Sequence, residues 1–212
     1  MKKKILIINT GGTLSSVAKE HGLTPDITTD SMMKELHIVA GEAELTTMDF
    51  MSLDSANIFP EDWAKLAEII SDNRDKYDGM VVIHGTDTMA YTSSMLSFML
   101  QNIPIPVVIT GSQLSISDPV ADAMENLRCA IFMAQTGKSG VFLAFNRKVI
   151  LGCRASKVRS ISFDAFDSIN APNVAEISSL GMKVNEDQLP KKSGIFHLQN
   201  NYSRDIAVVK MF

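Results

Sequence analysis

The strongest constraint on this chain is a unit that recurs along it: a short apolar run, a turn rich in glycine and threonine, and then a helical pattern. Continuous apolar runs are typical of strands buried on both faces, as in parallel sheets. Strands that alternate with helices predict right-handed crossovers and an α/β fold, with an open, mostly parallel sheet flanked by helices. We expect strands at Ile5–Ile8, Ala43–Leu53, Met80–Ile83, Val107–Thr110 and Gly140–Phe145, the last in a hairpin with Lys148–Leu151.

The segments between the strands predict amphipathic helices. We expect helices at Ser31–Val39, from Pro60 onward, at Met89–Gln101 and from about Pro119 to Gln135. In the third of these, apolar spacing assigns the inward face to Tyr91, Met95, Phe98 and Met99. The polar stretch Leu14–Asp30 predicts an irregular loop that is long enough to form a lid.

The composition is that of a soluble globular protein. Of 212 residues, 45% are hydrophobic and 21% are charged, and the formal net charge is −4. This charge gives no attraction for nucleic acid. The apolar run behind the basic cluster Lys2–Lys4 is too short for a signal peptide or a membrane span. We therefore expect a cytoplasmic protein with no nucleic-acid or membrane partner.

The cysteines and histidines show no spacing typical of a metal site. Cys129 and Cys153 are expected to be core thiols. The four histidines lack the i, i+4 spacing of zinc ligands: His21, His37, His84 and His197. We therefore expect no metal.

Four predicted strands end in polar turns, at Asn9–Thr13, Asp54–Asn57, His84–Thr88 and Gly111–Gln113. The carboxyl ends of parallel strands meet at one edge of a sheet, where ligands bind in open α/β folds. Six side chains are thereby expected to converge: Thr13, Asp54, Ser55, Thr86, Asp87 and Ser112. This convergence is the main functional signal from the pattern itself.

Simpler roles remain open for several of these residues. The Asn9–Thr13 segment has an alternative as an ordinary tight turn. Asp87 stands where an acid favours a helix N-terminus, although we favour substrate binding for it. Capping is the expected sole role of Asp122, with Asn126 as a supporting residue, and His84 is expected to fix its turn rather than to move protons.

The pattern fades beyond Gly152. We expect an irregular segment at Ser162–Gln188 and two short strands at Gly194–Gln199 and Ile206–Met211. The last strand either completes the sheet as an edge strand or begins a second domain, and the two alternatives have similar weight.

Two motifs in this order, Thr10–Thr13 and His84–Met89, resemble the signatures of the bacterial-type L-asparaginase family. Asp54–Ser55 and Thr110–Gln113 lie where that family places substrate-contacting loops. Three further segments resemble its cytoplasmic, type I branch: Pro60–Trp63, Ser97–Leu100 and Phe163–Phe166. The resemblance covers essentially the whole chain and implies the α/β N-terminal domain of an asparaginase over residues 1–190, with residues 191–212 as a linker and the start of a C-terminal domain that the chain lacks.

The resemblance implies hydrolysis of L-asparagine to L-aspartate and ammonia through a threonine acyl-enzyme, without metal or organic cofactor. Its implied catalytic residues are Thr13 as nucleophile and Thr86, Asp87 and Lys157 as a second group. Its implied substrate-binding residues are Asp54, Ser55, Gly85, Thr86, Asp87 and Ser112. A lysine acts as a base only if burial or a neighbouring cation, such as Arg154 or Arg159, favours its neutral form. Backbone amides of the two glycine turns are candidate oxyanion donors.

Two departures from the family pattern support an alternative function. Leu23 occupies the place of a lid tyrosine that hydrogen-bonds to the nucleophile in the family. The family's smaller C-terminal domain, which completes a neighbouring active site, would also be missing, whereas full-length members are expected to be homodimers or homotetramers. The alternative is therefore a catalytically weak domain that binds small amino acids. The asparaginase-like subunit of archaeal glutamyl-tRNA amidotransferases shares the motifs, but it carries a further domain ahead of the position of Thr10.

Overall fold

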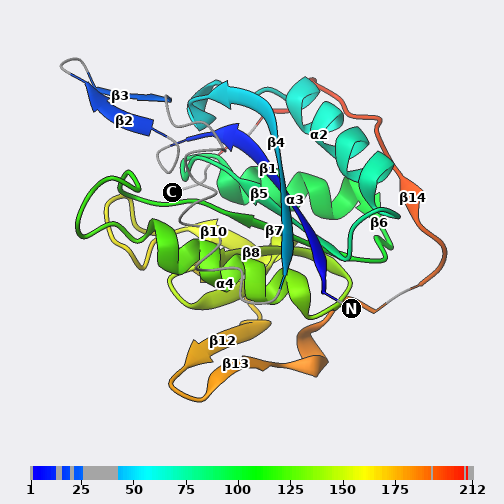
Figure 1. Cartoon of the computed structure of the whole chain (residues 1–212). Coiled ribbons are helices and arrows are strands. Elements are labelled where there is room, and N and C mark those ends of the chain that lie inside the picture. Colours follow the sequence, from blue (N-terminus) through cyan, green and yellow to red (C-terminus); the bar gives the residue numbers. More distant parts are fainter. Residues whose placement is uncertain are drawn as a thin grey trace.

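The computed structural model describes residues 2–12, 16–19, 22–25, 43–191, 193–207 and 209. Its centre is an eight-stranded sheet with the order β13-β12-β9-β8-β7-β5-β1-β4 (Figure 1). Five of these strands run parallel: β1 (Lys4–Gly11), β4 (Glu44–Leu53), β5 (Gly79–Ile83), β7 (Pro106–Thr110) and β8 (Gly140–Phe145). The predicted mostly parallel sheet and all five of its strands are confirmed.

The winding of the sheet reverses beside β1. In chain order β1 is the first parallel strand, yet it lies between the second, β4, and the third, β5. In open α/β sheets, ligands bind outside the carboxyl ends of the strands at such a reversal. The glycine turns that follow β1 and β5 therefore stand at the position where this class of fold binds ligands.

Helices cover both faces of the sheet (Figure 1). One face is packed by α2 (Pro60–Asn73) and α3 (Met89–Met99), and the other by α4 (Ala123–Gln135). Alternate side chains of β1 divide between the two cores: Leu6 and Ile8 pack with α2 and α3, whereas Ile5 and Ile7 pack with α4. Pro60 starts α2 as predicted, while α4 begins four residues after the predicted Pro119.

The predicted inward face of α3 is wrong for Tyr91 and Phe98, but it is confirmed for Met99, which is buried, and Met95 is partly buried against the core. Tyr91 and Phe98 are 65% and 63% exposed. The buried positions are Met89, Thr92, Ser93, Leu96 and Met99. Two polar residues face inward because they have partners there: Thr92 bonds to two side chains, and the Ser93 hydroxyl donates to the carbonyl of Gly152. The helix also ends at Met99, before the short strand β6 (Leu100–Gln101), rather than at Gln101.

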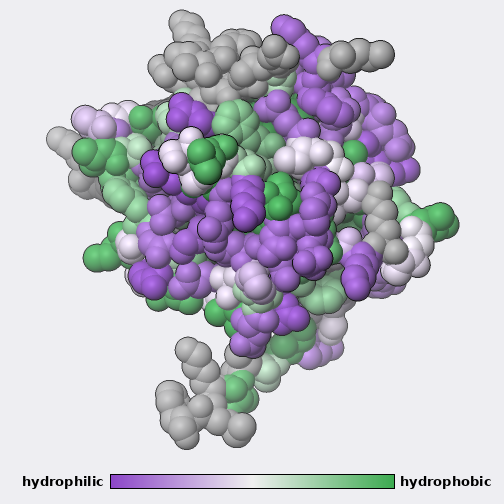
Figure 2. Space-filling model, turned by 90° about the horizontal axis from the view of Figure 1, so that it is seen from below, coloured by the Kyte–Doolittle hydropathy of each residue, from purple (hydrophilic) through white to green (hydrophobic). Residues whose placement is uncertain are grey.

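Strands after β8 extend the sheet beyond the expected hairpin. The predicted partner β9 (Lys148–Leu151) is antiparallel to β8. Next to it lie β12 (Ala175–Ser178) and β13 (Gly181–Val184), and a separate hairpin joins β10 (Ala155–Lys157) to β11 (Phe166–Ser168). The prediction of an irregular Ser162–Gln188 segment is therefore wrong for three strands. Seen from below, on the side of β12 and β13, the surface is mostly hydrophilic, and its hydrophobic residues form small separate groups (Figure 2).

The remaining elements are short. They comprise β2 (Ser16–Lys19) and β3 (Gly22–Pro25), the 3-10 helices η2 (Ser55–Asn57), η3 (Gly152–Arg154) and η4 (Glu186–Gln188), and β14 (His197–Leu198). Strands β2 and β3 form an antiparallel hairpin, so the expectation of an irregular lid is wrong for them. The predicted helix Ser31–Val39 lies outside the described residues.

Two expectations for the later part of the chain also fail. Within the predicted strand Ile206–Met211, the described residues Ile206, Ala207 and Val209 belong to no strand. Cys129 is a core thiol as predicted, and burial raises its pKa to about 12, but Cys153 is exposed. The division at residues 190 and 191 stays a prediction.

Candidate active site

Three turns meet at the carboxyl ends of β1, β4 and β5, and glycine allows their close approach. A Cβ on Gly12 would lie 2.4 Å from the backbone nitrogen of Gly85, and a Cβ on Gly85 would lie 2.6 Å from the hydroxyl of Ser55. Gly12 also has a φ of +87°, which other residues rarely adopt. The structure thus brings together the turns that carry Ser55, Gly85 and Thr86. Thr13, the predicted nucleophile, lies outside the described residues.

Hydrogen bonds hold the turn after β1 against the neighbouring strands. The Thr10 hydroxyl donates to the carbonyl oxygen of Ile83 at 2.8 Å and is buried. The amide of Gly11 donates to the side-chain oxygen of Asn9, and the amide of Gly12 donates to the carbonyl of Leu53. These bonds hold the turn on the neighbouring strands, and they also occupy two of the candidate oxyanion donors.

Lys157 contacts the turn that follows β5. It stands at the end of β10, and its Nζ lies 2.9 Å from the hydroxyl of Thr86 and 2.7 Å from a carboxylate oxygen of Asp87. Thr86 is buried, whereas the Asp87 side chain is 64% exposed. The Thr86 hydroxyl also faces the side-chain oxygen of Gln113 at 3.4 Å. The Lys157 nitrogen therefore lies within contact distance of both a hydroxyl and an open carboxylate.

The guanidinium of Arg159 is paired with acidic residues. It donates to the backbone oxygen of Asp164 at 2.8 Å and pairs with the carboxylates of Asp164 and Asp167 at 3.3 Å. These two anions offset the positive charge of Arg159. Arg154, the other cation considered, is exposed.

His84 stabilises the second turn through a buried chain of hydrogen bonds. Its Nδ1 donates to the backbone oxygen of Gly85 at 2.7 Å, so its Nε2 is free to accept from the Thr92 hydroxyl at 2.8 Å. The Thr92 oxygen in turn accepts from the indole N–H of Trp63. Burial lowers the pKa of His84 to about 4, because the charged ring would lose its hydration. A neutral His84 therefore holds the turn, as expected from the sequence.

Asp122 supports the loop that follows β7, and its expected capping role is wrong. Its carboxylate accepts from the backbone amides of Gln113 and Leu114 at 3.0 and 3.2 Å, and from the side chain of Asn126 at 2.9 Å, but makes no cap bond to α4. The Ser112 hydroxyl is fully buried and donates to the carbonyl of Leu114. Ser112 thus shapes this loop, and its neighbour Gln113 is the side chain that reaches Thr86.

Asp54 and Ser55 form the turn after β4. The Asp54 carboxylate caps the 3-10 helix η2 by accepting from the amide of Ala56 at 3.0 Å. Ser55 is buried, and its carbonyl accepts from the Thr88 hydroxyl at 2.8 Å. The cap residue of α3 is Thr88, and the neighbouring Asp87 contacts Lys157 instead. Asp54 therefore lies at the site, and its carboxylate stabilises the turn to which it belongs.

Two broader features of the described part of the chain bear on function. None of its groups of histidine, cysteine and acidic residues has the size and arrangement to hold a metal ion. None of its helices is both long enough and apolar enough to span a membrane.

One comparison decides the family. A family model described as asparaginase, N-terminal, matches residues 4–190. The chain belongs to the asparaginase family. The mostly parallel sheet and the two glycine turns are thus features of an asparaginase N-terminal region.

Individual asparaginases are similar in sequence and in structure. The L-asparaginase of Thermococcus kodakarensis is 45% identical over 175 residues, which are 82% of this chain and 53% of that protein. L-asparaginase 1 of Escherichia coli K12 is 34% identical over 218 aligned positions, which cover 100% of this chain and 64% of that protein. The solved structure of the thermostable T. kodakarensis L-asparaginase superimposes with a TM-score of 0.83 at 41% identity, over 93% of this chain and 60% of that chain.

A relative of another kind also matches. One subunit of the glutamyl-tRNA(Gln) amidotransferase of Methanosphaera stadtmanae is 31% identical over 224 aligned positions, which cover 100% of this chain and 51% of that protein. The chain therefore spans between 51% and 64% of the length of these curated relatives.

Proposed function

We propose that this protein hydrolyses the side-chain amide of L-asparagine to give L-aspartate and ammonia, with Thr13 as nucleophile. The observation that carries the proposal is the contact of Lys157 with both Thr86 and Asp87, at 2.9 and 2.7 Å. Relatives named L-asparaginase support the same substrate. Because the chain spans only part of the length of these relatives, their activity is a proposal for this protein.

The proposed reaction has two displacement steps. In the first, the Thr13 oxygen bonds to the amide carbon, the carbon–nitrogen bond breaks, and the hydroxyl proton ends on the leaving ammonia. In the second, water attacks the resulting ester, releases L-aspartate and restores the Thr13 hydroxyl. The Thr13 hydroxyl needs a base in the first step, and the attacking water needs one in the second. Lys157 serves as that base through the hydroxyl of Thr86, and its amine must be neutral to do so.

Asp87 is the proposed binding group for the charged amino group of the substrate. Its carboxylate is the exposed member of the group and is free to accept the α-ammonium of the substrate in a charge-assisted hydrogen bond. The same carboxylate now holds Lys157 at 2.7 Å. The α-ammonium of the substrate and Lys157 are therefore proposed to share the Asp87 carboxylate.

The remaining roles follow from positions at the three turns and in the loop after β7. Asp54 and Ser55 orient the α-amino and α-carboxylate ends of the substrate, and Gly85 and Ser112 shape the walls beside them. The amides of Gly11 and Gly12 are occupied, so those of the Gly85–Thr86 turn are the proposed oxyanion donors.

The alternative function is a domain that binds small amino acids without turnover. The observation that favours it is Leu23, which stands in β3 opposite Ala18, at the place of the family's lid tyrosine. Leucine neither donates nor accepts a hydrogen bond, so it gives no help to a nucleophile.

Ammonia release separates the two functions. The protein and its Thr13→Ala variant are incubated with L-asparagine, and L-glutamine serves as the comparison substrate. The proposal expects release from L-asparagine that the substitution abolishes. Equal release by both forms rules out Thr13 as nucleophile, whereas binding of L-asparagine without release by either form supports the alternative.

We further propose that the full-length protein is a cytoplasmic homodimer or homotetramer. The likeness to the probable cytoplasmic L-asparaginase of Campylobacter jejuni supports the location. Sedimentation of the full-length protein measures the oligomeric state, and a monomer at working concentrations contradicts this part of the proposal.

A further inference from the structure

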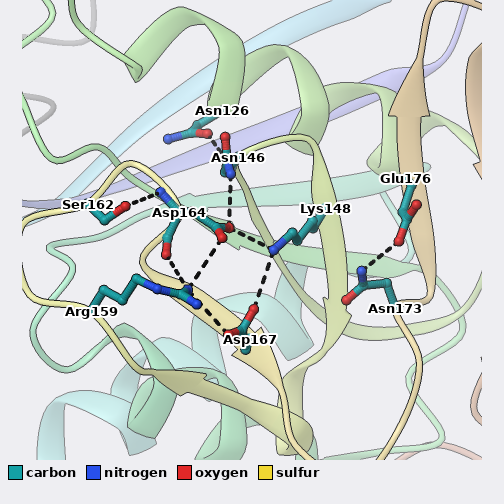
Figure 3. Close-up of polar contacts among 9 residues, drawn as sticks. All are labelled: Asn126, Asn146, Lys148, Arg159, Ser162, Asp164, Asp167, Asn173 and Glu176. Carbon is teal, nitrogen blue, oxygen red and sulfur yellow. Dashed lines mark hydrogen bonds and ion pairs between the residues drawn. The ribbon is translucent and has the colours of Figure 1, made fainter.

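Four charged side chains from β9, β11 and the loop between β10 and β11 form a closed cluster (Figure 3). Lys148 Nζ lies 2.7 Å from a carboxylate oxygen of Asp164 and 3.3 Å from one of Asp167. Arg159 pairs with the other oxygens of the same two carboxylates, at 3.3 Å each. Two cations and two anions thus neutralise one another, and the mechanism proposed above uses none of them.

Three members of the cluster lie on the hairpin that carries Lys157, and the fourth, Lys148, lies on β9. Strands β10 and β11 pair Lys157 with Phe166, and Arg159 and Asp164 lie in the loop between them. Phe166 is buried and packs edge-on against Phe145, with ring centroids 5.0 Å apart. Packing therefore anchors the hairpin on one strand, and the ion pair of Asp164 with Lys148 ties its loop to the sheet.

A hydrogen-bonded chain continues from the cluster toward the loop after β7 (Figure 3). The Asn146 side chain donates to the carboxylate of Asp164 at 2.9 Å, and the backbone N–H of Asn146 donates to the side-chain oxygen of Asn126 at 2.8 Å. The side chain of Asn126 donates to the carbonyl of Gly111 at 2.9 Å. Asp164 is thus joined to two elements of the site, the hairpin of Lys157 and the loop that starts at Gly111.

We propose that Asp164, held by Lys148, is a positioning residue that keeps Lys157 in contact with Thr86 and Asp87. The inference rests on the proposed function in one respect, the catalytic role of Lys157. The Asp164 carboxylate is the centre of the arrangement because it receives Lys148, Asn146 and Arg159. Removing its charge leaves the loop of the hairpin attached by backbone contacts and by Gln113, which donates to the carbonyl of Ser162.

The charge state of the cluster suits a permanent support. Hydrogen bonds from Lys148 and Asn146 lower the pKa of Asp164, so this carboxyl stays ionised at neutral pH. Burial acts to lower the pKa of Lys148, but the hydrogen bonds and charges of Asp164 and Asp167 outweigh it and raise that pKa. The ion pairs are partly exposed and contribute little to global stability, so the variants below are expected to fold.

Kinetics of three variants and a control test the inference. Asp164→Asn removes the charge at constant size, Lys148→Met removes the ammonium, and Lys148→Arg restores it. Lys138→Met is the matched control, because Lys138 forms a similar partly exposed pair with Glu186 ahead of β8, at the amino end of that strand. We expect kcat for L-asparagine to fall about tenfold or more in the first two, with KM nearly unchanged, and to recover in Lys148→Arg. Values of kcat equal to those of the control overturn the inference.

A second readout is independent of turnover. The rate at which acetic anhydride acetylates Lys157 is followed by mass spectrometry of peptides, relative to the exposed Lys65 on α2 in the same sample. The Lys157 side chain is only 17% exposed, so it is expected to react slowly, and about threefold faster in Asp164→Asn and Lys148→Met. An unchanged rate overturns the positioning role. A faster rate in a protein that releases no ammonia supports positioning and counts against the proposed function alone.

Discussion

The backbone nitrogen of Gly85 lies 2.4 Å from the point that a Cβ on Gly12 would occupy. Two turns that are separated by more than seventy residues of chain are therefore in direct backbone contact at the crevice between β1 and β5. Any side chain at Gly12 would push apart the turns that carry Thr13 and Thr86. The glycine at this position is explained both by its positive φ and by this approach.

Substitution of Gly12 by alanine separates these two effects when it is compared with Gly181→Ala. Gly181 has a similar φ of +94°, but nothing lies within 4 Å of its would-be Cβ. Gly181→Ala is expected to lower the free energy of unfolding by about 1 kcal/mol through backbone strain alone. Gly12→Ala is expected to cost about 1–3 kcal/mol more and to reduce ammonia release strongly. Urea unfolding measures both, and equal losses in the two variants would show that the close approach carries no strain.

Acid is expected to weaken the turn through His84. The unfolded chain binds a proton on this histidine near pH 6.5, whereas the folded protein does so only near its lowered pKa of about 4. The unfolded state therefore holds more protons between these values, and stability falls as the pH drops through this window. The loss reaches about 3 kcal/mol at pH 4 for a fully buried group.

His84→Gln isolates this contribution, since glutamine offers a donor and an acceptor without titrating. The free energy of unfolding is measured by urea titration from pH 7 to pH 4 for both forms. The difference between them is expected to shrink as the pH falls, because only the wild type loses the histidine contribution. A difference that stays constant across this range would contradict a buried, neutral His84.

The sequence predicts the centre of this fold better than its margins. Strands such as β5 and β7 are continuous apolar runs that end in glycine turns, so their type and even their shared edge follow from local chemistry. The face of α3 does not follow, because Thr92 and Ser93 are buried by partners that are distant in sequence. Strand β13 has four residues with weak alternation, too few for periodicity to detect.

The same division applies to the site. Convergence of Ser55, Thr86 and Asp87 follows from parallel topology alone. Lys157 does not, since it lies 71 residues from Thr86 on a three-residue strand, and only the family resemblance indicated it. For Asp122 the sequence favoured capping over a supporting role, because its partners, the backbone amides of Gln113 and Leu114, give no signal in a side-chain pattern.

The measurement that tests the account most directly is kcat/KM for L-asparagine in Lys157→Met, beside Lys138→Met and the wild type. Methionine keeps the length of the side chain and removes the amine that contacts Thr86 and Asp87. The account predicts that kcat/KM falls by about 10²–10⁴-fold in Lys157→Met and stays at the wild-type value in Lys138→Met. Undiminished ammonia release by Lys157→Met would contradict the assignment of this cluster as the catalytic centre.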